Sequence, residues 1–422
     1  GFNTAYAEND MTVSVDVGKE QYNVNALKLK ADNASVISAD TLGVTVGGYI
    51  ASGSNWSDTK TNLTTSVKAA GVKENVYNSL GAVNISSSGY SAVNNDANGY
   101  GGGIVGFNPV AARSQNQITT NTTADVSGKW QNVGSLSVAA NNADKLDILA
   151  DSLTAAVVGA SGTEIKNKVA HNANINVTGD ITTSGKQSYI ANNTLNHDVD
   201  LKGSGYGGGS VNVNDMDNDL TYTAGVNINN ATLNGTGSAG SIEALAYTDG
   251  KMNYSNTLKS AGVVPVTIAA SKNVITYNNS INVTGSNLST AKADQDITLA
   301  ATDETTATFD TTADTQGGAV GAASAKTDNT LNRSNKITVT NGKILSTNDV
   351  NIYAGANLDG ITSSLTYNVL ADAYNKTAVP LATAPKAKNT MTQKNQVSIN
   401  GDIDSVRHVN FKAGKGMTTV ST

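Results

Sequence analysis

Three alternating carboxylates are the most suggestive chemical feature of this sequence. Asp215, Asp217 and Asp219 lie in the stretch NDMDNDL and fill the first, third and fifth positions of a loop, where an EF-hand also places acidic calcium ligands. The sixth position holds Leu instead of Gly, and the twelfth holds Val instead of Glu. On a β-strand the alternation would put all three carboxylates on one face, where they repel each other unless water or a cation screens them. We therefore predict a solvated turn without a metal, and keep calcium binding as the alternative.

A glycine-rich stretch resembles a phosphate-binding loop in spacing only. GYGGGIVG (Gly99–Gly106) contains G-x-G-x-x-G, the pattern of a dinucleotide-binding turn that opens a helix. No amphipathic helix follows it, and the second copy, GYGGGSVN (Gly205–Asn212), contains Ser and lacks the third glycine. We interpret both copies as Gly-rich strands or tight corners and predict no cofactor.

The remaining reactive side chains are sparse. His171, His197 and His408 lie far apart in the sequence with no evident second ligand, and the absence of Cys excludes a thiolate metal site. The three arginines, Arg113, Arg333 and Arg407, are also far apart in the sequence, and no pair of acidic residues recurs beside them. Carbohydrate-active β-helices need such clusters of acids and bases. We therefore predict that the protein is not an enzyme, and we assign no catalytic, cofactor-binding or metal-binding residues.

The composition favours thin, pleated layers over a thick globular core. Aromatic residues make up 5% of the chain and charged residues 15%, with 41 Gly and only 4 Pro. Small and β-branched residues such as Val, Ile, Thr and Ala suit β-sheets. A net charge of −6 without a basic stripe argues against nucleic-acid binding. No apolar run approaches the ~18 residues of a membrane helix.

An internal repeat covers most of the chain. SNKITVTNGKILSTNDVNIYAG (Ser334–Gly355) and KNQVSINGDIDSVRHVNFKAG (Lys394–Gly414) share one shape: an alternating run, an Asn-Gly turn, a second run, a polar turn and a third run. Asn and Gly tolerate the positive φ that such a turn requires. Related segments recur at a spacing of roughly 53–60 residues, the sign of a repeat architecture, with origins near Ile118, Ile175, Ile228, Ile281, Ile337 and Val397.

The period-two alternation within each unit predicts strands. Three short strands and three turns in about 20 residues are typical of one rung of a parallel β-helix, so a unit would hold about three rungs. The general preference for right-handed crossovers predicts a right-handed β-solenoid. We expect residues 1–422 to form one continuous solenoid, an interior fragment of a longer chain. Leucines at helical spacing in Ala143–Ser161 allow a helix there, but the repeat favours a strand.

The repeat also predicts which side chains face inward. Ile281 and Ile337 begin strands at the repeat origin and should point into the interior, whereas Thr338 should point outward. Asn, Ser and Thr at the corners should bond from one rung to the next.

Several of these motifs resemble a known family. NKITVTNGKILSTNDVNIYAG, DTQGGAVGAASA (Asp314–Ala325), the paired GYGGG stretches and SVRHVNFKAG are similar to the repetitive shaft of large bacterial filamentous adhesins. The closest are those of the leukotoxin-type filamentous adhesin family and, more distantly, the filamentous haemagglutinins. The similarity is sharpest from Asn279 to Gly416. It implies a secreted β-helix, exported through an outer-membrane pore and displayed as a fibre on a diderm bacterium.

We therefore predict an extracellular structural shaft that holds binding regions away from the cell. Its faces would make weak multivalent contacts with host cells, other bacteria or matrix components. One alternative is a unit of a self-assembled extracellular fibre, associating laterally or end to end. The other is a carbohydrate-active β-helix enzyme.

Overall fold

The computed structural model describes residues 2–18, 25–71, 80–356, 363–414 and 417–421, and within these ranges it contains sixteen strands and no helix. All the strands belong to one sheet system, and every pairing within it is parallel. The fold is therefore an all-β parallel β-helix, as predicted. The strands are β1 (Phe2–Val17), β2 (Ala26–Val46), β3 (Ile50–Ala51), β4 (Ser54–Ala70), β5 (Leu80–Ser127), β6 (Lys129–Thr183), β7 (Gln187–Gly235), β8 (Ile242–Thr284), β9 (Asn287–Thr290), β10 (Ile297–Gln316), β11 (Val320–Ser346), β12 (Val350–Ala354), β13 (Ser364–Lys376), β14 (Val379–Ser405), β15 (Val409–Ala413) and β16 (Met417–Ser421).

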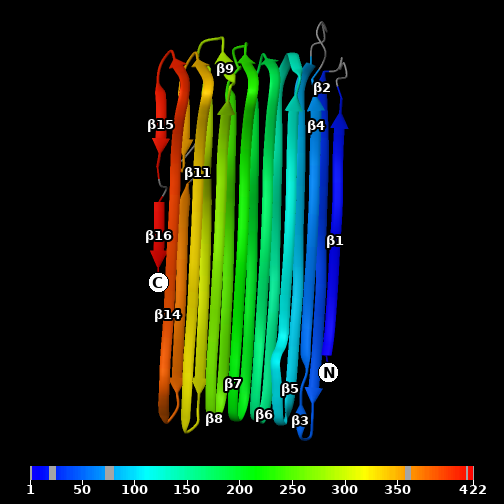
Figure 1. The fold of residues 1–422 in the computed structure, drawn as a ribbon, viewed down its shortest axis with the longest axis vertical. Helices are drawn as coiled ribbons and strands as arrows, with labels where there is room; N and C mark the ends of the chain where they lie inside the picture. Colours follow the sequence, from blue (N-terminus) through cyan, green and yellow to red (C-terminus); the bar gives the residue numbers. More distant parts are fainter. Residues whose placement is uncertain (1, 19–24, 72–79, 357–362, 415–416, 422) are drawn as a thin grey trace.

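The chain winds as a flattened coil with two long sides (Figure 1). One side runs down the figure in one layer, and after a sharp lower bend the other side runs up in a facing layer. β6 is an example: its first half pairs with the start of β7, from Leu136 against Gln187, and its second half pairs with the end of β7, up to Val177 against Ile228. A single strand can thus span most of a coil, because parallel pairing continues around the bend.

Each coil is much larger than the sequence analysis predicted. Paired residues lie 51 apart between β6 and β7 and 60 apart along most of the β11–β14 pairing. The expectation of a short three-strand rung, several of which would fill one repeat unit, is therefore wrong. The short triplet of Ser334–Gly355 is only the upper corner of one coil: the end of the rising side, a short third side and the start of the descending side. The pattern occurs once per coil because the rest of the coil is two long straight sides.

The predicted repeat origins all lie on the inward face of their strands, but only Ile175, Ile281, Ile337 and Val397 stack in one column from coil to coil. Ile228 lies two residues beyond the column and Ile118 six residues before it, and both are buried. Even offsets keep a residue on the same face of a strand. The stacked column is Ala124, Ile175, Val226, Ile281, Ile337 and Val397.

A left-handed residue turns the chain at the upper corner. Asn341 has φ 50°, as the Asn-Gly turn predicted. The same corner has a positive φ in each of the four preceding coils, at Gly128, Gly179, Asn230 and Gly285. The short third side that follows pairs from coil to coil, for example through β9 with β7 and β11.

The interior narrows from the upper corner to the lower bend. Ile, Val and Leu columns fill the upper part, whereas the lowest core cluster contains one Leu and five Ala. The two GYGGG stretches run into the lower bend inside β5 and β7. A Cβ on Gly205 would overlap the side chain of Asn212, and one on Gly207 would overlap the carbonyl oxygen of Ala156. These glycines therefore belong to a Gly-rich strand in which neighbouring groups pack closely, one of the two predicted alternatives, and Ala143–Ser161 is extended within β6.

Candidate functional site

A buried cluster of acid, imidazole and phenol groups lies midway along the interior. Asp144 and His171 come from the two sides of β6, His197 and Tyr222 from the two sides of β7, and Tyr254 from β8. Each occupies an inward position of an alternating strand, and each side chain is at most 3% exposed. The sequence analysis left His171 and His197 without a partner, and the structure supplies Asp144.

The cluster is centred on one carboxylate oxygen. Asp144 Oδ2 lies 2.9 Å from His197 Nε2 and accepts a hydrogen bond of 3.0 Å from the Tyr222 hydroxyl. His197 Nδ1 lies 2.6 Å from the Tyr254 hydroxyl. A neutral His197 protonated at Nε2 satisfies all three contacts, because Tyr254 then donates to Nδ1. His171 Nε2 lies 3.4 Å from the same carboxylate oxygen, but neither of its ring nitrogens makes a hydrogen bond.

Electrostatics favour an ionised Asp144 beside an uncharged His171. Burial raises the pKa of Asp144, but the nearby His197 and His171 and the hydrogen bonds together hold it below its usual value. Burial lowers the pKa of His171 more strongly than Asp144 raises it. Burial, followed by the charge of Asp144, raises the pKa of both Tyr222 and Tyr254 well above the usual range.

This arrangement can hold protons but is closed to substrate. Acid–imidazole–hydroxyl sets perform catalysis when they can reach a reacting atom, and here the packed coils cover every member. Across the part of the chain that the structure describes, no three His, Cys, Asp or Glu residues are arranged to hold a metal ion. We therefore interpret the cluster as an internal polar network.

A buried ion pair lies one coil further along the coil axis. Arg333 on β11 and Asp303 on β10 form an ion pair in which both side chains are nearly inaccessible. Asn335 donates a hydrogen bond of 2.6 Å to the other carboxylate oxygen of Asp303. Buried pairs of this kind add little net stability, but breaking one leaves an uncompensated charge.

A ladder of asparagines runs through the interior at right angles to the strands. Each side-chain amide donates to the amide oxygen of the next coil at 2.6–2.9 Å. The repeat pattern predicts such ladders at corners, but this one lies within the long rising side. Its members are Asn116, Asn167, Asn218, Asn273, Asn329 and Asn389.

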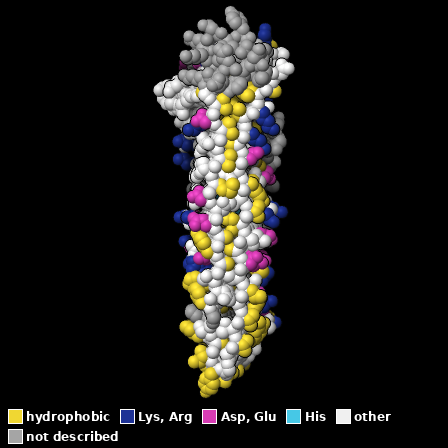
Figure 2. Space-filling view, turned by 90° about the vertical axis from the view of Figure 1, so that its right-hand side faces the viewer, with side chains coloured by type: hydrophobic (Ala, Val, Ile, Leu, Met, Phe, Trp, Pro, Cys, Tyr) yellow, Lys and Arg dark blue, Asp and Glu magenta, His cyan; other side chains and the backbone are white. Residues whose placement is uncertain are grey.

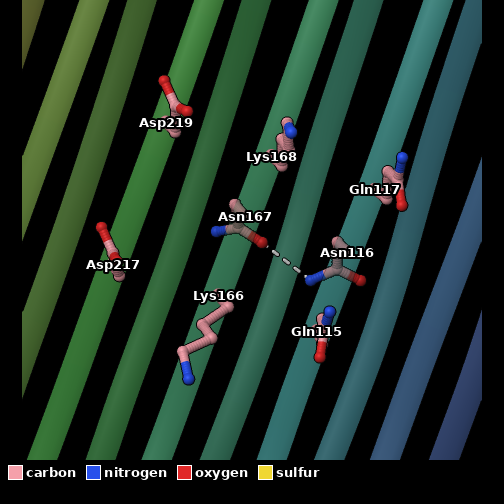
Figure 3. Close-up of a pocket in the computed structure, with 8 residues that line it drawn as sticks. All are labelled: Gln115, Asn116, Gln117, Lys166, Asn167, Lys168, Asp217 and Asp219. Carbon is pink, nitrogen blue, oxygen red and sulfur yellow. Dashed lines mark hydrogen bonds between the residues drawn. The ribbon is translucent and has the colours of Figure 1, made fainter.

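The three alternating aspartates lie on the outer face of the rising side. They are part of β7 and not of a turn, so the predicted solvated turn is wrong in its secondary structure. Two of them line a shallow cavity of about 260 Å3 that spans three neighbouring strands (Figure 3). The lining residues are Gln115, Asn116, Gln117, Lys166, Asn167, Lys168, Asp217 and Asp219.

Lysines from adjacent coils lie in register with two of these carboxylates, although Lys166 Nζ itself forms an ion pair with Glu164. Lys166 pairs in register with Asp217, and Lys168 with Asp219. Lys272 Nζ lies 3.8 Å from Asp217 Oδ1 on the opposite side. The cavity therefore has the character of an alternating charge ladder that can contact polar groups weakly. Burial, followed by the neighbouring carboxylates, raises the pKa of Asp215.

The other singled-out residues lie apart. Arg113 on β5 lies between Asp58 and Glu164, at 3.9 and 3.6 Å. Arg407 and His408 lie in the upper corner before β15, where His408 Nδ1 is 3.0 Å from Asp349 Oδ1.

Comparisons with known proteins add no relative: no family model matches the chain, and neither the curated proteins nor the solved structures contain a match. Within the described residues, no helix is long and apolar enough to cross a membrane.

Proposed function

We propose that this chain is a load-bearing shaft segment of a filamentous adhesin displayed on the surface of a diderm bacterium. Its resemblance to adhesin shafts motivates the surface assignment. The observation that carries the mechanical part is the uninterrupted stacking of coils: β5, β6, β7 and β8 each pair with the next in parallel along both long sides.

Such a body suits a stiff spacer. Eight rising strands stack in one layer (β1, β4, β5, β6, β7, β8, β11 and β14), so at ~4.8 Å per strand they advance only ~35 Å along the coil axis. Each coil contributes dozens of backbone hydrogen bonds parallel to that axis, and the buried asparagine ladder adds one side-chain bond per coil. Force applied along the axis is therefore shared among many parallel bonds.

The outer faces supply the surface contacts of the proposed adhesin. The charge ladder of Lys166, Asp217 and Lys272 alternates in sign from coil to coil. Single contacts to a ladder of this kind are weak and screened by salt, but a repeated array gains strength through multivalency. The expected partners are host-cell, bacterial or matrix surfaces outside the cell.

Single-molecule stretching between the two ends tests the shaft. Coils should peel off one after another, and roughly 51–60 residues per coil at ~3.3–3.6 Å each give steps of roughly 170–215 Å. Rungs of about 20 residues would instead give steps of roughly 70 Å. Extension without force peaks would show that the chain bears no load and would refute the proposal.

Deleting one whole coil provides a matched control for the stretching experiment. Removing residues 282–337 joins Ile281 to Thr338 at an equivalent position, because Ile281 pairs with Ile337. It also removes Asp303 and Arg333 together, so no buried charge is orphaned. The shortened chain should fold and show one step fewer. Removing half as many residues, 282–309, reverses the strand direction and should abolish folding.

A further inference from the structure

The lower bends of successive coils form an uncharged strip, which we call the lower edge. Seven consecutive bends each lie in a stretch without Asp, Glu, Lys, Arg or His, although charged residues bound every stretch on both sides. The charge-free stretches lie between Asp40 and Asp58, Asp96 and Arg113, Asp151 and Glu164, Lys202 and Asp215, Lys259 and Lys272, Asp314 and Lys326, and Lys376 and Lys386.

The lower edge exposes apolar side chains in most coils. Hydrophobic side chains gather over the lower end in Figure 2, below the charged side chains of the two faces. Together they expose on the order of 1,000 Å2, more than the ~300–600 Å2 of the largest apolar patch on a typical monomer. The exposed residues, each between 37% and 75% accessible, are Tyr49, Ile50, Ile104, Val105, Phe107, Val157, Val158, Tyr206, Val211, Val263, Val264, Val379 and Leu381.

These side chains repeat at the spacing of the coils. Equivalent residues of neighbouring coils pair in register, and where no pairing joins β8 to β11 at the bend, the Ala319 amide donates to the Val263 carbonyl at 2.9 Å. The resulting ridge has a pitch of ~4.8 Å set by the backbone. Its successive positions are Ile50, Val105, Val158, Gly209, Val264, Ala319 and Ala378.

We propose that the lower edge docks against the lower edge of a second copy of this chain. A rigid ridge can interdigitate at every coil only with a surface of the same pitch, and another copy has that pitch. The exposed apolar area is of the same order as the ~800 Å2 that one partner contributes to a standard interface. No charge needs to be desolvated, and the bounding residues supply a polar rim of both signs, as stable interfaces have.

A lipid surface fits the lower edge less well. Helices and loops that bind membranes usually combine Trp, Phe or Leu with Lys or Arg that attract anionic headgroups. The lower edge has no cation, and Val is its commonest exposed residue. Pairing of two copies would occur whether or not the chain serves as a shaft, so the two proposals fail independently.

The absence of Cys from the chain allows a clean cross-linking test. Gly209 is the fourth of the seven ridge positions, so its copy faces it in a two-fold dimer whether the coil axes run parallel or antiparallel. A Cβ at Gly209 meets no atom within 4 Å, and the same holds for Gly18, at the opposite end of the coil. Gly209→Cys and Gly18→Cys are therefore matched variants that both leave the fold intact.

Sedimentation and mild oxidation then decide the proposal. The wild type should be a dimer at micromolar concentration, Gly209→Cys should form a disulfide-linked dimer, and Gly18→Cys should not. Adding Val158→Lys and Val264→Lys to Gly209→Cys should abolish both dimer and cross-link, whereas Val36→Lys, at an exposed valine outside the edge, should not. A monomeric wild type or equal cross-linking of the two cysteine variants would overturn the proposal. So would flotation of a monomeric wild type with phosphatidylcholine vesicles, which would assign the lower edge to lipid.

Discussion

Replacing one asparagine of the buried ladder should destabilise the protein far more than replacing an equivalent asparagine on the outer face. Asn218→Ala removes the acceptor of Asn167 Nδ2, at 2.7 Å, and the donor to Asn273 Oδ1, at 2.6 Å. Both groups are then buried without a partner, because all three side chains are at most 2% exposed. Each orphaned group costs about 1–3 kcal/mol, so the local loss of stability should be about 2–6 kcal/mol.

The same strand offers a matched control. Asn227, nine residues further along β7, also bonds to both neighbouring coils, through Asn176 at 3.0 Å and Asn282 at 2.9 Å. These three side chains are only partly buried, so water can replace the lost partner. Asn227→Ala should therefore cost about 1 kcal/mol or less.

Hydrogen exchange measured by mass spectrometry suits this test, because a chain of stacked coils opens locally. Amides in the rising halves of β6, β7 and β8 should exchange roughly 30-fold faster or more in Asn218→Ala, since each 1.4 kcal/mol corresponds to a factor of ten. Asn227→Ala should change exchange by less than about tenfold. Similar rates in the two variants would refute the claim that burial, and not the bond itself, determines the contribution of the ladder.

Three further perturbations test the interior. Because burial lowers the pKa of His171, the unfolded chain binds more protons below the usual value of 6.5, so stability should fall as the pH drops through this range. Melting of His171→Gln should show less of this pH dependence, and an unchanged dependence would exclude His171 as its source. Ile337→Asp should cost several kcal/mol because it buries an unpaired charge, whereas the outward Thr338→Asp should cost about 0.5 kcal/mol; equal melting temperatures would contradict their opposite facing. Arg333→Met should cost about 3–5 kcal/mol by stranding Asp303, and adding Asp303→Asn should restore most of that loss. A double variant as unstable as the single one would show that packing, not charge pairing, matters there.

The lower edge shows what periodicity alone could have revealed. Charge-free stretches of nine to seventeen residues recur once per coil along the sequence. A repeat at that spacing would have indicated both the size of the coil and a distinct uncharged surface. Apolar alternation does not reveal these stretches, because Gly, Ala and Ser dominate several of them.

The buried charges show where local patterns stop being sufficient. Arg333 has the same strand parity as Leu331 and Ile337, and His171 the same as Ile175, so alternation already placed both side chains inward. A charge at an inward position contradicts its usual preference for water. Only the fold supplies Asp303 and Asp144, which reach these positions from another strand or from the opposite side of a coil.

The sequence by itself thus determined strand character, the facing of Ile281 and Ile337, the left-handed turn at Asn341 and the existence of a repeat. These follow from backbone sterics and from burial of alternate side chains, which act over a few residues. Tertiary structure alone decided the register in which successive coils stack and which side chains meet inside them. The physical reason is that parallel pairing joins positions a whole coil apart in the chain, so their register depends on how two complete coils pack and not on any local signal.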